Sequence, residues 1–311
     1  MTRYVVTGGA GFIGSALVRV LLARGDSQVR VIDNLLTGRE SNLAGIQDRI
    51  EWDQSDIRDA KAILSAVRGA EIVFHLAAIP SVPRSIKDPG PSHEVNIDGT
   101  FNVFRACLEA KVRRVVYAAS SSAYGDTAVL PKVETMLPRP KSPYAVQKLM
   151  GEHYASVFHS CFGLETVALR FFNVYGERQD PSSPYSGVLS LFMKALIERS
   201  APTIFGDGEQ TRDFTYVDDV AALCLKAAAA PGVAGNMYNA GNGNRYSLNT
   251  VWDLLQKIEG LRIPPNYGPP REGDVRDSQA DTTAARRDLG HAPQYSLEEG
   301  LRRTLSWYRA Q

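Results

Sequence analysis

The sequence contains little cysteine and no excess of charge of either sign. Its 311 residues include three cysteines, which are far apart and form no Cys-x-x-Cys pair: Cys107, Cys161 and Cys224. This spacing indicates neither a disulfide framework nor a zinc site, and it favours a reducing compartment. The 35 Lys and Arg residues nearly balance the 34 Asp and Glu residues, which gives a net charge of +1. That balance excludes an obvious nucleic-acid-binding protein.

Long hydrophobic runs are also missing, because no apolar stretch approaches the roughly 18 residues that a membrane helix needs. The N-terminal residues lack the basic head and apolar stretch of a secretory signal. We therefore expect a cytoplasmic protein without a membrane partner. With 44% hydrophobic residues in 311, the chain is large enough to bury a substantial core.

The first half of the chain alternates short apolar runs with helical patterns. This alternation predicts a parallel sheet wrapped by helices. Unbroken runs such as Ile72–Phe74 suit strands buried on both faces, so we expect a doubly wound α/β sheet. The predicted strands are 4–7, 29–33, 50–53, 72–75, 114–118 and 166–170, and the predicted helices are 13–23, 60–67, 95–110 and 144–162.

Prolines and glycines interrupt the pattern after about Asn173, which favours a smaller, loop-rich lobe of mixed α/β structure. We therefore expect a sheet domain over residues 1–172 and a second lobe made mainly of residues 173–311. Two segments of the second half indicate returns to the sheet near residues 215–240. Thr215–Ala230 resembles a strand followed by an alanine-rich helix, and Met237–Ala240 resembles a short strand.

A glycine motif follows the first predicted strand and opens the first predicted helix. Gly8 allows an unusual turn, Gly11 allows the backbone to approach a pyrophosphate, and Gly14 allows the helix to pack closely on the strand. The amides at the helix start favour an anion. Asp33, at the end of the second predicted strand, is placed to accept hydrogen bonds from an adenosine ribose.

The charge of Asp33 would repel a 2′-phosphate, and no arginine stands immediately beside it, so we expect NAD rather than NADP. Asp56 and Ile57 follow the third predicted strand and are suited to hydrogen-bond and cover the adenine. An equally good interpretation is a simple turn, in which an Asp after Arg58 caps the next helix.

Tyr144 and Lys148 stand four residues apart on one face of a predicted helix. A nearby positive charge favours phenolate, so Lys148 is expected to lower the pKa of Tyr144 and make it a usable base. Ser120, Ser121 and Ser122 follow a predicted parallel strand, at the edge where open α/β sheets bind ligands. A serine, a tyrosine and a lysine that converge beside a nicotinamide would form a hydride-transfer site.

Together, these motifs resemble the extended short-chain dehydrogenase/reductase family, specifically the nucleotide-sugar epimerases, with their Rossmann-like sheet and smaller substrate-binding lobe. The resemblance covers essentially the whole chain. It rests on Gly8-x-x-Gly11-x-x-Gly14, Asp33-Asn34, His75-Leu76-Ala77-Ala78, Asn96, residues 120–125, Tyr144-x-x-x-Lys148 and Arg170-Phe171-Phe172-Asn173-Val174-Tyr175-Gly176. His75 is then a strand-end residue rather than a catalyst.

The resemblance implies bound NAD and a UDP-sugar substrate, with NAD in the first domain and the sugar nucleotide mainly in the second. Implied cofactor-binding residues are Gly8, Gly11, Phe12, Ile13, Gly14, Asp33, Asn34, Asp56, Ile57, Leu76, Ala77, Ala78, Asn96, Tyr144 and Lys148. Implied substrate-binding residues are Arg84, Ser85, Ser121, Ser122, Tyr144, Asn173, Val188, Thr203, Phe205, Arg212, Arg271, Asp274 and Ser278.

The catalytic serine is ambiguous, because the run is one residue shorter before Tyr124 than the commoner family spacing. Counting back from Tyr124 gives Ser120, and counting forward from the strand gives Ser121, which we prefer because register is inherited from the strand. No carboxylate stands in the serine run, where related dehydratases and decarboxylases carry acidic residues. A 4-keto sugar would then only be reduced again, which implies 4-epimerisation.

Residues 81–89 and 273–278 resemble the UDP-N-acetylglucosamine 4-epimerases, and Ser278 leaves room where a tyrosine would exclude an acetamido group. The implied reaction interconverts UDP-N-acetylglucosamine and UDP-N-acetylgalactosamine, with UDP-glucose and UDP-galactose as further substrates. Alternatives are a UDP-glucose 4-epimerase without acetamido activity, another sugar-nucleotide enzyme of this family, or a non-catalytic NAD-binding regulator. The resemblance also implies a homodimer formed by the helices at 95–110 and 144–162.

Overall fold

A seven-stranded parallel sheet forms the centre of the molecule. The computed structural model describes residues 1–181, 187–270 and 275–311. The strand order is β3-β2-β1-β4-β5-β6-β11, and every neighbouring pair is parallel. The strands are β1 (Thr2–Thr7), β2 (Ser27–Ile32), β3 (Glu51–Asp53), β4 (Ile72–His75), β5 (Arg114–Ser120), β6 (Glu165–Phe171) and β11 (Met237–Ala240). The predicted doubly wound sheet is confirmed, including the return of residues 237–240 to it.

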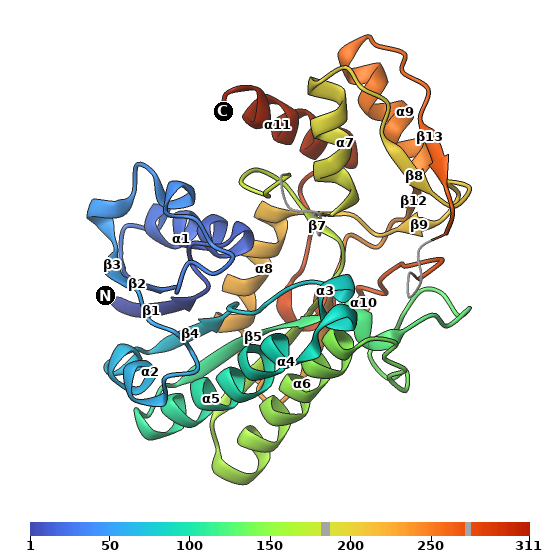
Figure 1. Ribbon diagram of the computed structural model, residues 1–311. Coiled ribbons are helices and arrows are strands. Elements are labelled where there is room, and N and C mark those ends of the chain that lie inside the picture. The colour runs from blue at the N-terminus through green and yellow to red at the C-terminus, as the bar shows by residue number, and fades with distance from the viewer. Residues whose placement is uncertain (182–186, 271–274) are drawn as a thin grey trace.

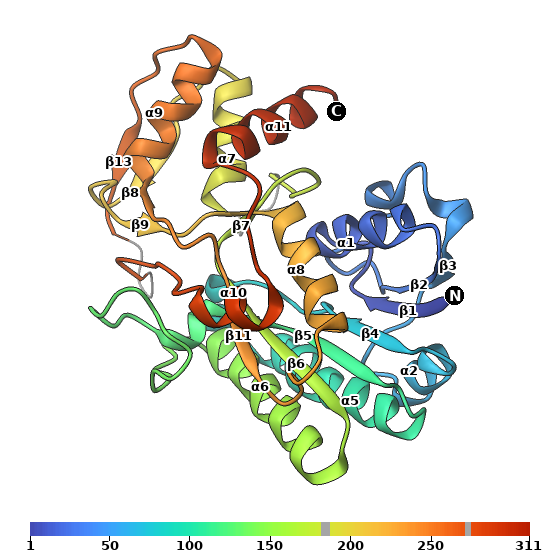
Figure 2. The same ribbon diagram turned by 180° about the vertical axis from the view of Figure 1, so that it is seen from behind.

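Helices cover both faces of this sheet (Figure 1). One face packs against α2 (Ala60–Val67), α5 (Thr100–Glu109) and α6 (Pro143–Phe162), and its core contains Ile63, Phe104 and Phe158. The other face packs against α1 (Phe12–Ala23), α8 (Val217–Ala229) and α10 (Thr283–Leu289), which Figure 2 shows from behind. Because both faces are covered, the central strands are apolar without alternation, as β4 with four buried residues illustrates.

Helix α6 has strong local signals at both ends. The Ser142 hydroxyl accepts a hydrogen bond from the Ala145 amide, and Pro143 occupies the first turn, where a proline loses no helical hydrogen bond. Gly163 ends the helix in a left-handed conformation with φ +74°. The helix predicted over residues 144–162 is therefore confirmed, and its first turn stands beside the end of β5.

The helix predicted over residues 95–110 begins differently, with a wide π turn at Glu94–Gly99 that leads into α5. Asn96 lies in this turn, and its side chain is fully used. It accepts from the Ile79 amide at 2.8 Å and donates to the Ile79 carbonyl and to Gln147. The turn thus fixes the loop after β4, which also carries the short helices α3 (Val82–Lys87) and α4 (Pro89–His93).

The second lobe contains α7 (Val188–Ile197), α9 (Leu248–Glu259) and α11 (Leu297–Arg309), packed around Phe192, Trp252 and Leu301. Its strands form only two-stranded pairs: β7 (Val174–Tyr175) with β10 (Thr215–Tyr216), β8 (Thr203–Phe205) with β13 (Asn266–Gly268), and β9 (Thr211–Arg212) with β12 (Tyr246–Ser247). The strand predicted at residue 215 therefore exists, but it lies outside the central sheet.

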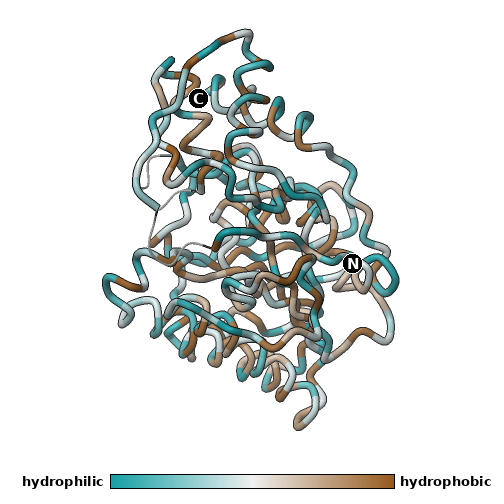
Figure 3. The backbone as a smooth tube through the Cα atoms, turned by 90° about the vertical axis from the view of Figure 1, so that its right-hand side faces the viewer, coloured by the Kyte–Doolittle hydropathy of each residue, from teal (hydrophilic) through white to brown (hydrophobic). Residues whose placement is uncertain are grey.

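Hydrophobic residues follow the central strands, and hydrophilic residues are commoner in the outer loops (Figure 3). Across the described ranges of the chain, the structure contains no helix whose length and apolar character would suffice to cross a membrane.

Candidate active site

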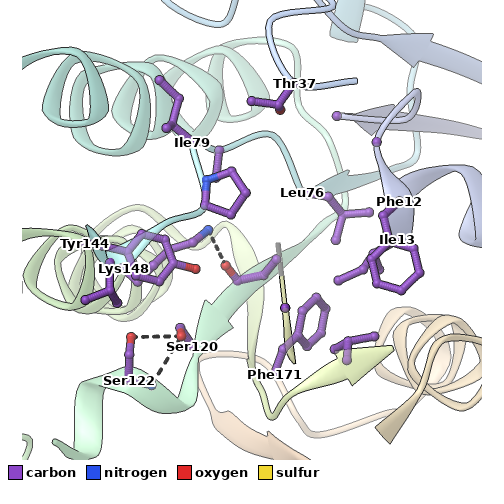
Figure 4. A pocket seen from close by; sticks show the side chains of 18 of the residues that line it. Phe12, Ile13, Thr37, Leu76, Ile79, Ser120, Ser122, Tyr144, Lys148 and Phe171 are labelled. Carbon is purple, nitrogen blue, oxygen red and sulfur yellow. Dashed lines mark hydrogen bonds between the residues drawn. The ribbon is translucent and has the colours of Figure 1, made fainter. Parts of the chain in front are cut away.

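A cavity of about 940 Å³ opens at the carboxyl ends of β1, β4 and β5, and both lobes line it. The chain runs from β1 outward to β3 and then resumes at β4 on the other side of β1, so the direction of winding reverses between β1 and β4. Such a reversal point is where open α/β sheets bind ligands. The glycine motif, Tyr144 and the serine run all border this cavity. Figure 4 shows Tyr144, Ser120 and Ser122 on one side of it and Phe12 on the other.

The turn between β1 and α1 leaves no room for side chains. At Gly8, with φ +73°, a Cβ would lie 2.7 Å from the Ala77 nitrogen, and at Gly14 it would lie 2.1 Å from the Gly8 carbonyl oxygen. Gly11 is the N-cap of α1 and makes no side-chain cap, so the first amides of the helix remain available to an anion. These residues fit the pyrophosphate of a dinucleotide.

Replacing Gly14 with alanine is expected to loosen this turn, because its new Cβ would collide with backbone rather than with a flexible side chain. We expect a loss of about 1–3 kcal/mol in the free energy of unfolding, with weaker NAD binding. Thermal denaturation with and without added NAD measures both effects. Gly90→Ala is a control for overpacking, since Gly90 is not in the left-handed region and its Cβ would meet only Asp88 Oδ1, at an ordinary contact distance of 3.5 Å. Equal effects from the two variants would contradict the role given to Gly14.

Asp33 follows β2, and its carboxylate is held in place by two backbone amides. Oδ2 accepts from the Ala10 amide at 3.0 Å and Oδ1 from the Leu35 amide at 2.9 Å. Burial raises the pKa of Asp33, and the two amides act in the opposite direction. Because a carboxylate offers about four acceptor positions, two remain for ribose hydroxyls. Asp33 therefore fits the role expected for an NAD-binding residue.

Seven further expected cofactor residues line the cavity: Phe12, Ile13, Asn34, Ile57, Leu76, Ala77 and Ala78. Asp56 and Asn96 are not in its wall. Asp56 accepts a hydrogen bond from the Asn34 side chain at 2.8 Å, and Arg58 lowers the pKa of Asp56 to about 2. Asp59, the Asp after Arg58, caps α2. Asp56 thus orients Asn34, while Asn96 holds the loop at Ile79 that borders the cavity.

Of the three serines, Ser120 is the one whose side chain lowers the pKa of the Tyr144 phenol, which favours Ser120 over the preferred Ser121 as its partner. The reason is that β5 continues two residues beyond its predicted end at Ala118, so Ser120 is its last residue, and Ser121 begins a 3₁₀ turn. The Ser120 hydroxyl also accepts from the Ser122 hydroxyl at 2.9 Å (Figure 4). Ser121 and Ser122 still line the cavity.

Lys148 is buried, and its Nζ donates to the Ala118 carbonyl at 2.7 Å. Burial lowers the pKa of Lys148 to about 8, and Glu152 acts in the opposite direction. The expectation that Lys148 lowers the pKa of Tyr144 is wrong for the protein alone. Burial raises the pKa of the Tyr144 phenol, and the hydrogen bond with Ser120 opposes this rise. His75 is buried and hydrogen-bonded to Thr7 and Thr100, as suits a strand-end residue.

The expected substrate residues divide into those in the cavity wall and those outside it. Arg84, Asn173, Arg212 and Ser278 line the cavity together with the serine run. Ser85 is fully buried, and its hydroxyl accepts a hydrogen bond from the Tyr144 amide at 3.1 Å. It therefore fixes the backbone of Tyr144 and is not itself in the cavity wall. Val188, Thr203 and Phe205 are not among the residues that form the wall. Arg271 and Asp274 lie outside the described residues.

Sequence reasoning missed Arg39, Lys132, Lys141, Asp180 and Asp277, which also line the cavity. They stand in loops that come together only in the folded chain, so no local pattern marks them. It also missed Glu152, which lies four residues beyond Lys148 on α6; this spacing was a signal in the sequence. Among the described residues, no cluster of His, Cys, Asp and Glu is suited to hold a metal ion.

The chain is similar to proteins of known class over its full length. The family model of the NAD dependent epimerase/dehydratase family matches residues 4–241. A UDP-glucose 4-epimerase of Mycolicibacterium smegmatis is 40% identical, over 99% of this chain and 98% of its own.

Two solved structures extend this similarity to the fold. A UDP-N-acetylglucosamine 4-epimerase from Methanobrevibacter ruminantium M1, in complex with UDP-N-acetylmuramic acid, is 36% identical with a TM-score of 0.95, covering 100% of this chain and 99% of that one. A UDP-glucuronic acid 4-epimerase from Bacillus cereus, in complex with UDP-glucuronic acid and NAD, is 33% identical with a TM-score of 0.92, covering 99% of both chains. These similarities agree with the glycine turn, the Asp33 carboxylate and the tyrosine–lysine pair of the cavity. The chain therefore belongs to the NAD-dependent epimerase/dehydratase family and uses NAD as its cofactor.

Proposed function

We propose that this NAD-dependent UDP-sugar 4-epimerase interconverts UDP-N-acetylglucosamine and UDP-N-acetylgalactosamine, and that it also accepts UDP-glucose and UDP-galactose. The observation that carries the acetamido activity is a small residue, Ser278, in the cavity wall that also contains Arg212. The Ser278 amide donates to the Thr211 carbonyl at 3.1 Å, which fixes the backbone at this point. A serine side chain there leaves space for a substituent on the sugar.

We assign the proton transfer to Tyr144 with Ser120. As phenolate, Tyr144 would take the proton of the sugar 4-hydroxyl and become the neutral phenol, and Ser120, the serine that lowers the pKa of Tyr144, would hydrogen-bond the same sugar oxygen. NAD, when bound, would supply the acceptor for the hydride of C4 and the donor that reduces the 4-keto sugar again on its other face. Lys148 places a positive charge under this end of the cavity and is suited to hold the nicotinamide ribose.

Elimination or decarboxylation would need an additional acid or base close to Tyr144. The turn Ser121–Tyr124 contains none, and the carboxylates in the described part of the cavity wall are Asp33, Asp180 and Asp277. Asp33 is committed to the amides of Ala10 and Leu35, and Asp180 pairs with Arg39 at 2.5 Å. Asp277 accepts from the Thr211 hydroxyl. This distribution supports re-reduction of the ketone, and hence epimerisation.

The diphosphate of the substrate would be held by Arg212, since a guanidinium matches phosphate oxygens. We retain Arg271 as a second phosphate ligand and Asp274 as a ligand of the uridine ribose, on the family resemblance alone. Thr203, Phe205 and Val188 remain candidates for contact with the uracil end only if substrate binding extends the cavity toward α7 and β8.

The proposal is tested by incubating the purified protein, without added cofactor, with UDP-N-acetylglucosamine and separately with UDP-glucose. Proton NMR of both mixtures identifies the products. A galacto product from the acetylated sugar is the expected result. Turnover of UDP-glucose alone would remove the acetamido activity from the proposal. Absence of product from both, with NAD supplied, would leave a different sugar nucleotide or a non-catalytic NAD-binding protein.

We further propose a homodimer formed through α5 and α6. Exposed apolar side chains follow one face of α6 at helical spacing, with Val146 44% exposed, Met150 36% and Val157 46%, and Phe101 of α5 is 36% exposed beside them. Monomeric proteins rarely expose such a contiguous apolar surface. A second copy of the same two helices would cover it by forming a four-helix bundle.

Replacing Met150 with glutamate is expected to convert the dimer into a monomer, because the charge would have to be buried without a partner. Sedimentation equilibrium measures the molar mass in solution. Ile197→Glu is the matched control, since Ile197 is 41% exposed at the end of α7, away from this face. A wild-type protein that sediments as a monomer, or a dimer unchanged by Met150→Glu, would contradict the proposed interface.

A further inference from the structure

A buried ion pair joins α6, the helix of Tyr144 and Lys148, to β6, and it takes no part in the mechanism described above. Arg170 of β6 donates from Nε to Glu152 Oε1 at 2.9 Å and from Nη2 to Oε2 at 2.7 Å, so both carboxylate oxygens are held. The two side chains are 2% and 7% exposed. The desolvation of two buried charges costs most of the free energy that their attraction contributes, so a buried ion pair adds little to stability. Its presence here indicates another role.

Glu152 stands on the same face of α6 as the two catalytic groups, because Tyr144, Lys148 and Glu152 are spaced at four-residue intervals. We propose that Glu152 is a positioning residue for the reaction: its carboxylate, fixed by Arg170, keeps the buried Lys148 side chain in its charged ammonium form. This inference rests on the proposed function only for its kinetic consequence, since the charge of Lys148 can be observed directly.

The other groups that face Lys148 supply no negative charge. Tyr117 of β5 places its ring centroid 5.1 Å from Lys148 Nζ, and burial raises the pKa of its phenol, so it stays neutral. His75 of β4 is held neutral, because burial lowers its pKa to about 3. Tyr144 is neutral as well, for the reason given above. Arg170 of β6 adds a positive charge. Among the residues that the structure describes, Glu152 is therefore the group that opposes the burial favouring a neutral lysine.

Arg170 is itself fixed from the opposite side. Its guanidinium carbon lies 4.4 Å from the centroid of the Tyr124 ring, and the Tyr124 hydroxyl donates to Asn239 Oδ1 at 2.6 Å. Asn239, on β11, donates in turn to the carbonyls of Lys132 and Asp281. The carboxylate behind Lys148 is thus held through a continuous buried network that reaches the segment carrying Ser278.

The charge of Lys148 is measured first without any substrate. In protein with ¹³C-labelled lysine Cε, the resonance that disappears in Lys148→Met is titrated by NMR. In Glu152→Gln we expect its pKa to fall by at least one unit relative to the wild-type protein. An unchanged titration in a folded Glu152→Gln protein would overturn the inference, whatever the enzyme does with sugar nucleotides.

The kinetic measurement is the pH dependence of kcat between pH 5.5 and 9.5. In Glu152→Gln, the alkaline limb should move to lower pH by at least one unit, so that kcat above the limb falls at least tenfold, about 1.4 kcal/mol, relative to wild type. KM should change little, and Glu152→Asp should restore the profile in part. A uniform fall in kcat with an unshifted limb would indicate a merely structural role and overturn the inference.

Two further variants separate charge from folding. Glu165→Gln is the matched control, because Glu165 also pairs with a buried arginine, Arg114, at 2.8 Å, but at the other end of β6. It should lower Tm without moving the alkaline limb.

Should Glu152→Gln fail to fold, the double variant Glu152→Gln/Arg170→Met removes both buried charges and should fold. A limb that is still displaced in the double variant supports the inference, and a wild-type limb overturns it. Wild-type protein without turnover would refute the proposed function instead, and the NMR titration would still decide the inference.

Discussion

Tyr144→Phe is expected to reduce kcat by about 10²–10⁴-fold, the usual contribution of a positioned acid or base. The substitution removes only the phenol oxygen, the group whose pKa Ser120 lowers. The ring and the backbone hydrogen bond from the Tyr144 amide to Ser85 remain, so the first turn of α6 should keep its position. Turnover of UDP-glucose and UDP-N-acetylglucosamine should fall together, because the same hydroxyl proton is transferred in both.

Bound NAD should be unaffected in this variant, since the glycine turn and Asp33 lie on other elements of the cavity. Release of the dinucleotide by acid denaturation, followed by chromatography, measures its occupancy. Tyr175→Phe is the matched control, because it also removes one buried hydroxyl, which donates to the Leu297 carbonyl, and neither residue is in the cavity wall. Activity retained in Tyr144→Phe, or lost equally in Tyr175→Phe, would show that the base has been assigned wrongly.

Ser278→Tyr is expected to lower kcat/KM for UDP-N-acetylglucosamine on the order of 100-fold relative to UDP-glucose. The new ring would fill the part of the cavity that we assign to the 2-acetamido group. The backbone cannot move aside easily, because the Ser278 amide is bound to the Thr211 carbonyl and Asp277 bridges to the same residue. The collision must therefore be relieved by the substrate, and only the larger sugar has a group that collides.

Competition between the two substrates in one reaction mixture measures this ratio directly and cancels differences in protein quality. Ser278→Ala should leave the ratio close to that of wild type, because it changes the hydroxyl without adding volume. A substrate ratio in Ser278→Tyr equal to that of wild type would remove Ser278 from the determinants of specificity, although the epimerase activity itself would stand.

The sheet domain was predictable because its signals are local. Runs such as Ile72–His75 are buried on both faces, and Ser142, Pro143 and Gly163 mark the ends of α6. The glycine turn and the Tyr144–Lys148 pair were predictable for the same reason. The end of β5 was less predictable: the strand continues through Ser120, whereas Ser121 begins the following turn, so the two neighbouring serines differ in backbone direction in a way that counting along the sequence does not reveal.

The second lobe was not predictable in the same way. Its strands are two or three residues long, and each pairs with a segment at least 34 positions away, as Tyr246 pairs with Arg212. Strands this short carry no periodic pattern. The cavity wall contributed by Lys132, Asp180 and Asp277 depends on these pairings, so it could be found only in the folded chain. The pKa of Tyr144 was also inaccessible, since it is set by burial.

The return of β11 to the sheet means that the two lobes do not meet as separate bodies. β11 occupies the edge beside β6, and α8 packs across α1, although both elements follow the first part of the second lobe in the chain. A polypeptide that ended after residue 172 would leave β6 with unpaired backbone groups and the apolar face of α1 open to water, which invites edge-to-edge aggregation. A chimera that exchanges the substrate lobe between relatives would therefore have to keep α8 and β11 with the sheet domain that they complete.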